Sequence, residues 1–84
     1  MGIMVVSVEF IGNHRVVTKT DSIQIPITEK TTANDVLDYL GKKYPGLSLA
    51  KESILITVNQ AVVPRDRLLK ANDTICLLPY VGGG

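Results

Sequence analysis

Alternating apolar and polar positions run through residues 3–11, near the start of the chain. This segment is rich in β-branched side chains, which favour strands over helices. Its apolar face would consist of Met4, Val6, Val8 and Phe10. Gly12 and Asn13 then interrupt the alternation. The pattern therefore predicts a first strand followed by a connection over residues 12–21.

A second alternation covers residues 22–28. Ile23, Ile25 and Ile27 would lie on one face of a strand, and Pro26 would point to the other. Proline has no backbone N–H to donate to a neighbouring strand, so it is largely confined to sheet edges. We therefore expect the second strand at an edge of the sheet.

The periodicity changes to that of a helix after residue 32. Apolar side chains recur at helical spacing on an otherwise polar segment, at Ala33, Val36, Leu37, Leu40 and Tyr44. Thr32 and Asp35 have the spacing of a capping box, in which each side chain accepts a hydrogen bond from the backbone N–H of the other residue. Pro45 and Gly46 follow, a combination that ends helices. This helix is the clearest element that the sequence predicts.

Three short strands are expected after the helix. Residues 54–58 and 61–63 are apolar and β-branched, and residues 74–78 are apolar on both faces. Asn59-Gln60 and Ala71-Asn72-Asp73 are turn candidates, because asparagine tolerates a left-handed backbone. A strand that is apolar on both faces lies inside a sheet or has one face covered by a partner. The predicted order is ββαβββ, an α+β fold with one helix packed across one face of a mixed sheet.

Size and composition restrict the functional classes. Eighty-four residues suffice for one domain, and a net charge of +1 with intermixed signs argues against nucleic acid or a membrane as partner. The apolar run after Met1 ends at Ser7, too short for a signal peptide or a membrane span. Cys76 is the only cysteine, which suits a reducing compartment. We therefore expect a cytoplasmic protein with a domain over residues 1–79 and a flexible tail over residues 80–84.

After Leu78 the chain reads Pro79-Tyr80-Val81-Gly82-Gly83-Gly84. Glycines have no side chain to bury, so this end is expected to project as a mobile segment that reaches roughly 20 Å when extended. Its one reactive group is the terminal carboxylate of Gly84, which needs activation before it can donate an acyl group. The rest of the sequence has no P-loop, metal-ligand cluster or nucleophile–base pairing to supply that activation. The tail is therefore interpreted as a substrate of other enzymes.

A family pattern extends this interpretation. The chain has a strand ending in Val58-Asn59, a short apolar strand, a turn over residues 69–73, and an apolar strand that leads into the Gly-Gly end. The helix ending in Tyr44-Pro45-Gly46 belongs to the same pattern. In these features the chain resembles the MoaD/ThiS-type sulfur carriers over essentially its whole length, with a weak match at residues 12–21. Tyr80 stands where a second proline is usual and Gly82 where Ala or Ser is usual, which leaves the sulfur acceptor open.

The resemblance implies a ubiquitin-like β-grasp fold in which the first and last strands are central. It also implies a sulfur carrier, closest to the small subunit of molybdopterin synthase. A MoeB/ThiF-type adenylyltransferase, similar to ubiquitin-activating enzymes, would use ATP and Mg²⁺ to adenylate the Gly84 carboxylate, and a sulfur donor would convert it to a thiocarboxylate. Tyr80, Val81, Gly82 and Gly83 would insert into a partner such as the large subunit of molybdopterin synthase. The carrier would bind no cofactor or metal and would not be an enzyme on its own.

Phe10, Arg65 and Leu78 are candidate residues of a partner surface. Phe10 has a competing interpretation as a core residue, and Arg65 belongs to a charged turn that would ordinarily be solvated. The alternation within residues 74–78 does not settle which of its two faces meets the helix. His14 is interpreted as a solvated residue of a connection, and Cys76 as a small core residue.

Two other functions fit a glycine-rich end. The protein could be a ubiquitin-like modifier joined through Gly84 to lysines of target proteins, or an interaction domain whose glycines are inert. A chain that stops directly after Gly83-Gly84, with nothing left to trim, favours an active tail over an inert one. The Pro79-Tyr80-Val81 approach favours the carrier over the modifier, because the tail of ubiquitin is rich in arginine.

Overall fold

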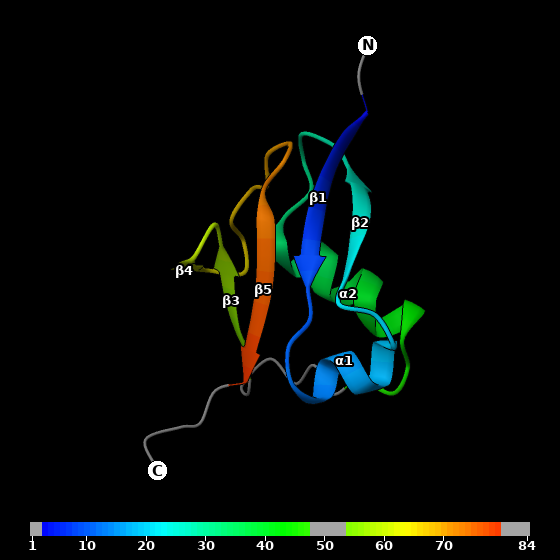
Figure 1. The fold of residues 1–84 in the computed structure, drawn as a ribbon. Coiled ribbons are helices and arrows are strands. Elements are labelled where there is room, and N and C mark those ends of the chain that lie inside the picture. Colours follow the sequence, from blue (N-terminus) through cyan, green and yellow to red (C-terminus); the bar gives the residue numbers. More distant parts are fainter. Residues whose placement is uncertain (1–2, 48–53, 80–84) are drawn as a thin grey trace.

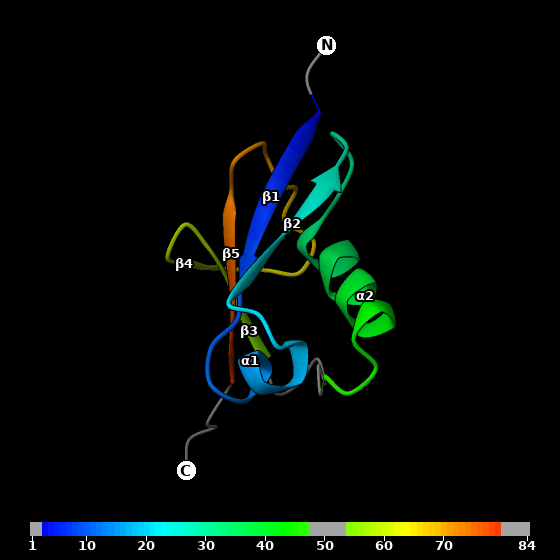
Figure 2. The same ribbon diagram turned by 45° about the vertical axis from the view of Figure 1, so that its right-hand side comes forward.

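The computed structural model describes residues 3–47 and 54–79, and the predicted tail over residues 80–84 lies outside them (Figure 1). The described residues form a five-stranded sheet in the order β2-β1-β5-β3-β4. Its strands are β1 (Met4–Glu9), β2 (Ser22–Ile27), β3 (Ile54–Val58), β4 (Ala61–Val63) and β5 (Thr74–Pro79), and the helices are α1 (Asn13–Thr18) and α2 (Ala33–Lys43). Seen from two directions, α2 lies across one face of the sheet and α1 lies at one end (Figures 1 and 2). The α+β fold class is confirmed.

The strand β5 occupies the centre of the sheet. It pairs in parallel with β1 and antiparallel with β3, so the prediction that the first and last strands are central is confirmed. β2 lies at an edge, as Pro26 predicted, and pairs antiparallel with β1. Because β1 and β5 are parallel, both strands end at the same edge of the sheet, and the chain leaves β5 there at Pro79.

The core lies between the sheet and α2. Val6, Leu40 and Leu77 are fully buried in it. Ile75 and Leu77 of β5 face α2, whereas Cys76 and Leu78 are only half-buried on the opposite face. The burial pattern thus settles which face of β5 meets the helix. It also shows that Cys76 is not a core residue, contrary to the prediction.

The helix α2 begins with the predicted capping box. The Thr32 hydroxyl accepts a hydrogen bond from the Asp35 N–H at 3.2 Å, and the Asp35 carboxylate accepts one from the Thr32 N–H at 2.9 Å. The next amides, of Ala33 and Asn34, donate to the carbonyl oxygens of Arg67 and Arg65 at 3.0 and 2.8 Å. The loop after β4 therefore satisfies backbone donors that a helix start leaves unpaired, and this fixes the loop against α2.

The connection predicted over residues 12–21 contains a six-residue helix, α1, that the pattern did not indicate. Gly12 precedes it with a φ of 55°, and Lys19 closes it in a left-handed conformation with its N–H donating to the Arg15 carbonyl at 2.8 Å. The helix was missed because its six residues contain no apolar side chains at helical spacing. His14 lies on this helix and is half-buried, which corrects its interpretation as a solvated loop residue.

The turn between β3 and β4 is tied to the start of β5. Asn59 and Gln60 both have positive φ, 52° and 76°, as a type I′ hairpin turn requires. The Asn59 side chain accepts a hydrogen bond from the Thr74 N–H and donates one to the Asp73 carboxylate, each at 3.0 Å. Asp73 is itself buried, and its carboxylate also accepts from the Lys70 N–H at 2.8 Å. This network fixes the end of the sheet opposite to the exit of the tail.

Replacing Gln60 with glycine is expected to stabilise the domain by about 1 kcal/mol, because only glycine adopts a φ of 76° without a steric cost. Chemical denaturation followed by circular dichroism would measure the free energy of unfolding. Gln24→Gly, on the exposed edge strand β2 with no left-handed φ, is the matched control and should lower stability. If the Gln60→Gly protein is no more stable than the wild type, the left-handed backbone at Gln60 is not strained.

Candidate functional site

The root of the tail is the end of the central strand. Pro79 pairs with Ile54 of β3, and Leu78 lies directly opposite Leu55. β3 holds this end in register, whereas β1 pairs with β5 only over residues 74–76. The structure therefore places the start of the predicted tail at the β3-paired end of the central strand. Gly84 and the residues Tyr80, Val81, Gly82 and Gly83 lie outside the described residues, and their roles stay predictions.

An apolar surface lies beside this root, on the face that α2 does not cover. Thr57 pairs with Val62 on one side and with Cys76 on the other, so these positions share the uncovered face. The apolar side chains there come from the three neighbouring strands β3, β4 and β5. We call this surface the sheet patch, made of Leu55, Val62, Cys76 and Leu78. Val62 is 63% exposed, and the other three are half-buried.

Leu78 is one of the three predicted partner-surface residues, and it is placed in the sheet patch. Leu55 and Val62 were not predicted, although both are apolar residues at the alternate positions of their strands. Alternation identifies two sets of positions in each strand, but only the pairing of strands shows which sets share a face. The pairing of Leu55 with Leu78 shows that both side chains belong to the sheet patch.

Phe10 does not belong to the partner surface. It is 2% exposed and packs edge-on against the Tyr44 ring, with ring centroids 5.9 Å apart. The prediction of Phe10 as a contact residue was therefore wrong, and its competing interpretation as a core residue is confirmed. The physical reason is the inward face of β1, which Phe10 continues just beyond the strand.

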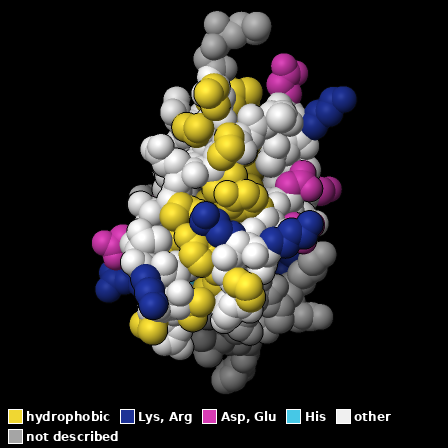
Figure 3. Space-filling view, turned by 90° about the vertical axis from the view of Figure 1, so that its right-hand side faces the viewer, with side chains coloured by type: hydrophobic (Ala, Val, Ile, Leu, Met, Phe, Trp, Pro, Cys, Tyr) yellow, Lys and Arg dark blue, Asp and Glu magenta, His cyan; other side chains and the backbone are white. Residues whose placement is uncertain are grey.

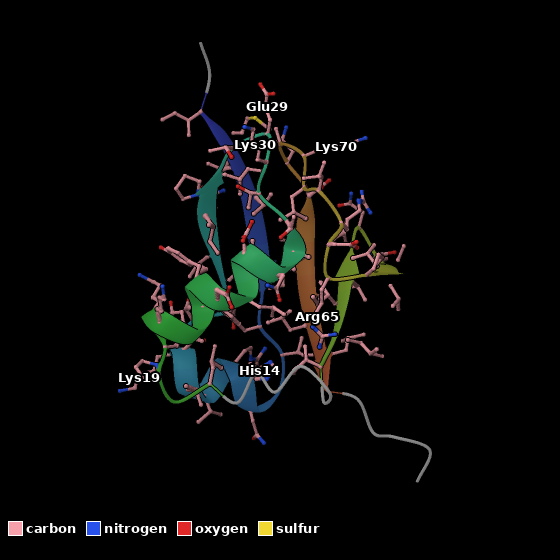
Figure 4. All side chains as sticks on the ribbon, turned by 180° about the vertical axis from the view of Figure 1, so that it is seen from behind. His14, Lys19, Glu29, Lys30, Arg65 and Lys70 are labelled. Carbon is pink, nitrogen blue, oxygen red and sulfur yellow. The ribbon has the colours of Figure 1, made fainter. Side chains whose placement is uncertain are left out.

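Arg65 is half-buried on the side of the sheet that α2 covers (Figure 4). Its Nη2 donates to the carbonyl oxygen of Ile54 at 3.4 Å, and Ile54 is the residue opposite Pro79. The guanidinium therefore lies close to the root of the tail, whereas its backbone carbonyl caps α2. A contact between Arg65 and a partner stays a prediction.

A shallow depression of about 400 Å³ adjoins the sheet patch. It is lined by Glu9, Thr57, Asn59, Gln60, Thr74 and Cys76. Desolvation raises the pKa of the Cys76 thiol above its ordinary value of 9.0, and the negative charge of Glu9 raises it further. A thiol with a raised pKa is a weak nucleophile at neutral pH, because the thiolate is the reactive form. This part of the domain therefore offers a surface rather than a nucleophile.

The described residues contain no cluster of three or more His, Cys, Asp or Glu side chains that could hold a metal ion. Within the same ranges, none of the helices is long and apolar enough to cross a membrane.

Comparisons with known proteins agree with this geometry. The ThiS family matches the chain over residues 8–84. The molybdopterin synthase sulfur carrier subunit of Dictyostelium discoideum is 38% identical over 64 residues, which cover 74% of this chain and 73% of that protein. The corresponding subunit of Haemophilus influenzae is 31% identical over 80 residues, 93% of this chain and 98% of that protein. The solution structure of the small archaeal modifier protein 1 from Methanosarcina acetivorans superposes with a TM-score of 0.75 at 27% identity and covers 100% of both chains.

The chain therefore belongs to the ThiS family. It is a sulfur carrier of the MoaD/ThiS type with a ubiquitin-like β-grasp fold.

Alkylation of Cys76 by iodoacetamide is expected to accelerate with rising pH with a midpoint above 9.0, because folding holds the proton on the thiol. Glu9→Gln should lower that midpoint by removing a repulsive charge, but not to 9.0, because desolvation is the larger cause. Mass spectrometry of the alkylated protein gives the rates. The same protein unfolded in urea is the control, and an equal midpoint in both states would contradict the assigned environment.

Proposed function

We propose that the protein carries sulfur on its C-terminus, as a thiocarboxylate of Gly84 that is made by an adenylyltransferase and consumed in cofactor biosynthesis. The most specific form of the proposal is the small subunit of a molybdopterin synthase. The observation that carries it is the family match, which continues through residue 84 and so includes the terminal glycines. The two carrier subunits from Dictyostelium and Haemophilus support the pathway.

The arrangement of the domain supports separate roles for the folded part, which binds partners, and for the tail, which carries the reactive group. The tail begins at a central strand that is paired on both sides, and the sheet patch lies on the uncovered face beside it. Cys76, the only cysteine, has a raised pKa, which argues against a thiol-based step on the domain itself. A rigid frame that supports a reactive end is suited to presenting that end to other enzymes.

The proposed chemistry needs two steps, one at phosphorus and one at the acyl carbon of Gly84. In the first, a Gly84 carboxylate oxygen attacks the α-phosphorus of ATP, and the bond to the β-phosphate oxygen breaks to release pyrophosphate. In the second, a sulfur nucleophile at the hydrosulfide oxidation level attacks the acyl carbon, a C–S bond forms, and AMP leaves. Mg²⁺ and ATP belong to the activating enzyme, where the cation offsets the charge of the phosphates.

Two partners follow from this chemistry. One is a MoeB/ThiF-type adenylyltransferase, and the other is the large subunit of a molybdopterin synthase, which would receive Tyr80–Gly84 in its active site. We propose that both dock on the sheet patch, with Arg65 as a further contact at the root of the tail. Because ATP-dependent activation and a reduced sulfur donor are both needed, we place this work in the cytoplasm.

A second candidate function is conjugation of Gly84 to lysines of other proteins. It is favoured by the structural match to an archaeal protein that is named a modifier. Both functions begin with the same adenylate, so they diverge only in the nucleophile that accepts the acyl group. An amine would give an isopeptide bond, and a sulfur nucleophile would give the thiocarboxylate.

Incubation with the adenylyltransferase of the same organism, ATP, Mg²⁺ and a sulfur source is expected to produce a mass gain equal to one oxygen replaced by sulfur. Intact-mass spectrometry measures it, and fragmentation locates it at Gly84. Omission of ATP is the control. Branched Gly-Gly remnants on lysines of other proteins, without a thiocarboxylate, would establish the modifier instead, and formation of neither species would overturn both functions.

Deleting Gly84 is expected to abolish thiocarboxylate formation, and Gly83→Phe should slow it about 100-fold or more, because a bulky side chain displaces the acyl carbon in a narrow channel. Neither change should alter the melting temperature, since both positions lie beyond the last strand. Activity assays paired with thermal unfolding test this. A drop in melting temperature with either variant would contradict a tail independent of the core.

A further inference from the structure

The helix α1 presents apolar side chains to solvent. Val16 is 72% exposed, and Ile11, just before the helix, is 40% exposed. β-branched residues are weak helix formers, so a valine at an exposed position of a six-residue helix gains little from propensity or burial. The stability of the helix therefore does not account for Val16.

The neighbouring Val17 differs from Val16, because its side chain lies close to Gly46, just beyond the end of α2. A Cβ placed on Gly46, just beyond α2, would lie 3.3 Å from the Val17 Cγ1 atom, so glycine permits this close approach. α1 therefore lies against the end of α2, while Val16 stays exposed. The exposed valine is thus displayed from a helix and not from an irregular loop.

Two basic side chains lie next to the exposed Val16. Arg15, Val16 and Lys19 line a shallow depression of about 460 Å³, in which the carboxylate of Asp21 lies 3.6 Å from the Arg15 guanidinium. The left-handed backbone at Lys19 is held by its hydrogen bond to the Arg15 carbonyl. Figure 4 shows Lys19 beside the end of α2, and Figure 3 shows hydrophobic and basic side chains next to one another on this side of the molecule. We call Ile11, Arg15, Val16 and Lys19 the α1 patch.

The α1 patch lies at the same end of the domain as the root of the tail. α1 follows β1 directly, and the parallel strands β1 and β5 end at one edge of the sheet (Figure 1). The α1 patch is separate from the sheet patch, because it stands at the end of the sheet and not on its uncovered face. An enzyme that encloses the tail down to Pro79 would contact both the sheet patch and the α1 patch.

We propose that the α1 patch is a second docking surface for the adenylyltransferase that activates the tail, an inference that rests on the proposed function. The matching surface of that enzyme carries aliphatic side chains flanked by carboxylates, because exposed aliphatic groups rimmed by cations bind that combination. The patch contributes to recognition of the enzyme and takes no part in the chemistry at Gly84.

The test measures ATP–pyrophosphate exchange by the adenylyltransferase of the same organism as the carrier concentration is varied. Val16→Asp is expected to raise the half-saturating concentration of the carrier about tenfold, with the rate at saturation unchanged, because it places a carboxylate against an acidic rim. Lys19→Glu should also raise the half-saturating concentration of the carrier, and it should make that concentration less dependent on salt. Ile3→Asp is the matched control, because Ile3 is 82% exposed at the opposite end of β1, and it should leave the value unchanged.

Circular dichroism and thermal unfolding of each variant check that the fold is intact. The inference is overturned if Val16→Asp has the half-saturating concentration of the wild type, or if Ile3→Asp raises that concentration equally. Failure of the wild-type carrier to support any exchange is a different result, since it overturns the proposed function before the variants are compared.

Discussion

The parallel pairing of β1 with β5 is the constraint on which the rest of the structure depends. This pairing joins the first and last strands of the described chain. The turn before β5 adds two hydrogen bonds to it: the Ser7 N–H donates to the Asp73 carbonyl, and the Asn72 N–H donates to the Val5 carbonyl. Parallel neighbours cannot be joined by a tight turn, so the chain between them must cross over the sheet. That crossover carries α2, which covers one face of the sheet and leaves the other uncovered. The parallel pairing also brings α1, which follows β1, to the same edge as the root of the tail.

Local chemistry made much of this frame predictable. The capping box and apolar stripe of α2 act within a few residues, so their pattern identified the helix and its start correctly. Pro26 predicted an edge strand because a missing N–H has the same consequence in any sheet. The apolar character of both faces of β5 predicted either a place inside the sheet or a face covered by a partner, and β5 does lie inside the sheet.

The features that sequence alone could not predict depend on distant residues. α1 lies close to Gly46, which is distant in the sequence, and Leu55 and Val62 join the sheet patch only through strand pairing. The Val58-Asn59 pattern was part of the family resemblance, but the Asn59 side chain ties a hairpin turn to the start of β5, at the end of the sheet opposite to the tail. That signal therefore identifies the frame of the domain, whereas the proposed chemistry rests on the terminal glycines.

The position of β5 also determines how the domain responds to force. A partner that grips the residues after Pro79 and pulls would load β5 along its own axis, while β1 and β3 hold it from both sides. The hydrogen bonds to β3, and those to β1 over residues 74–76, would then be strained in shear, not broken one after another as they would be at a peeling edge. The sheet would therefore resist such a pull, and the C-terminal residues could be withdrawn from a partner without unfolding the domain.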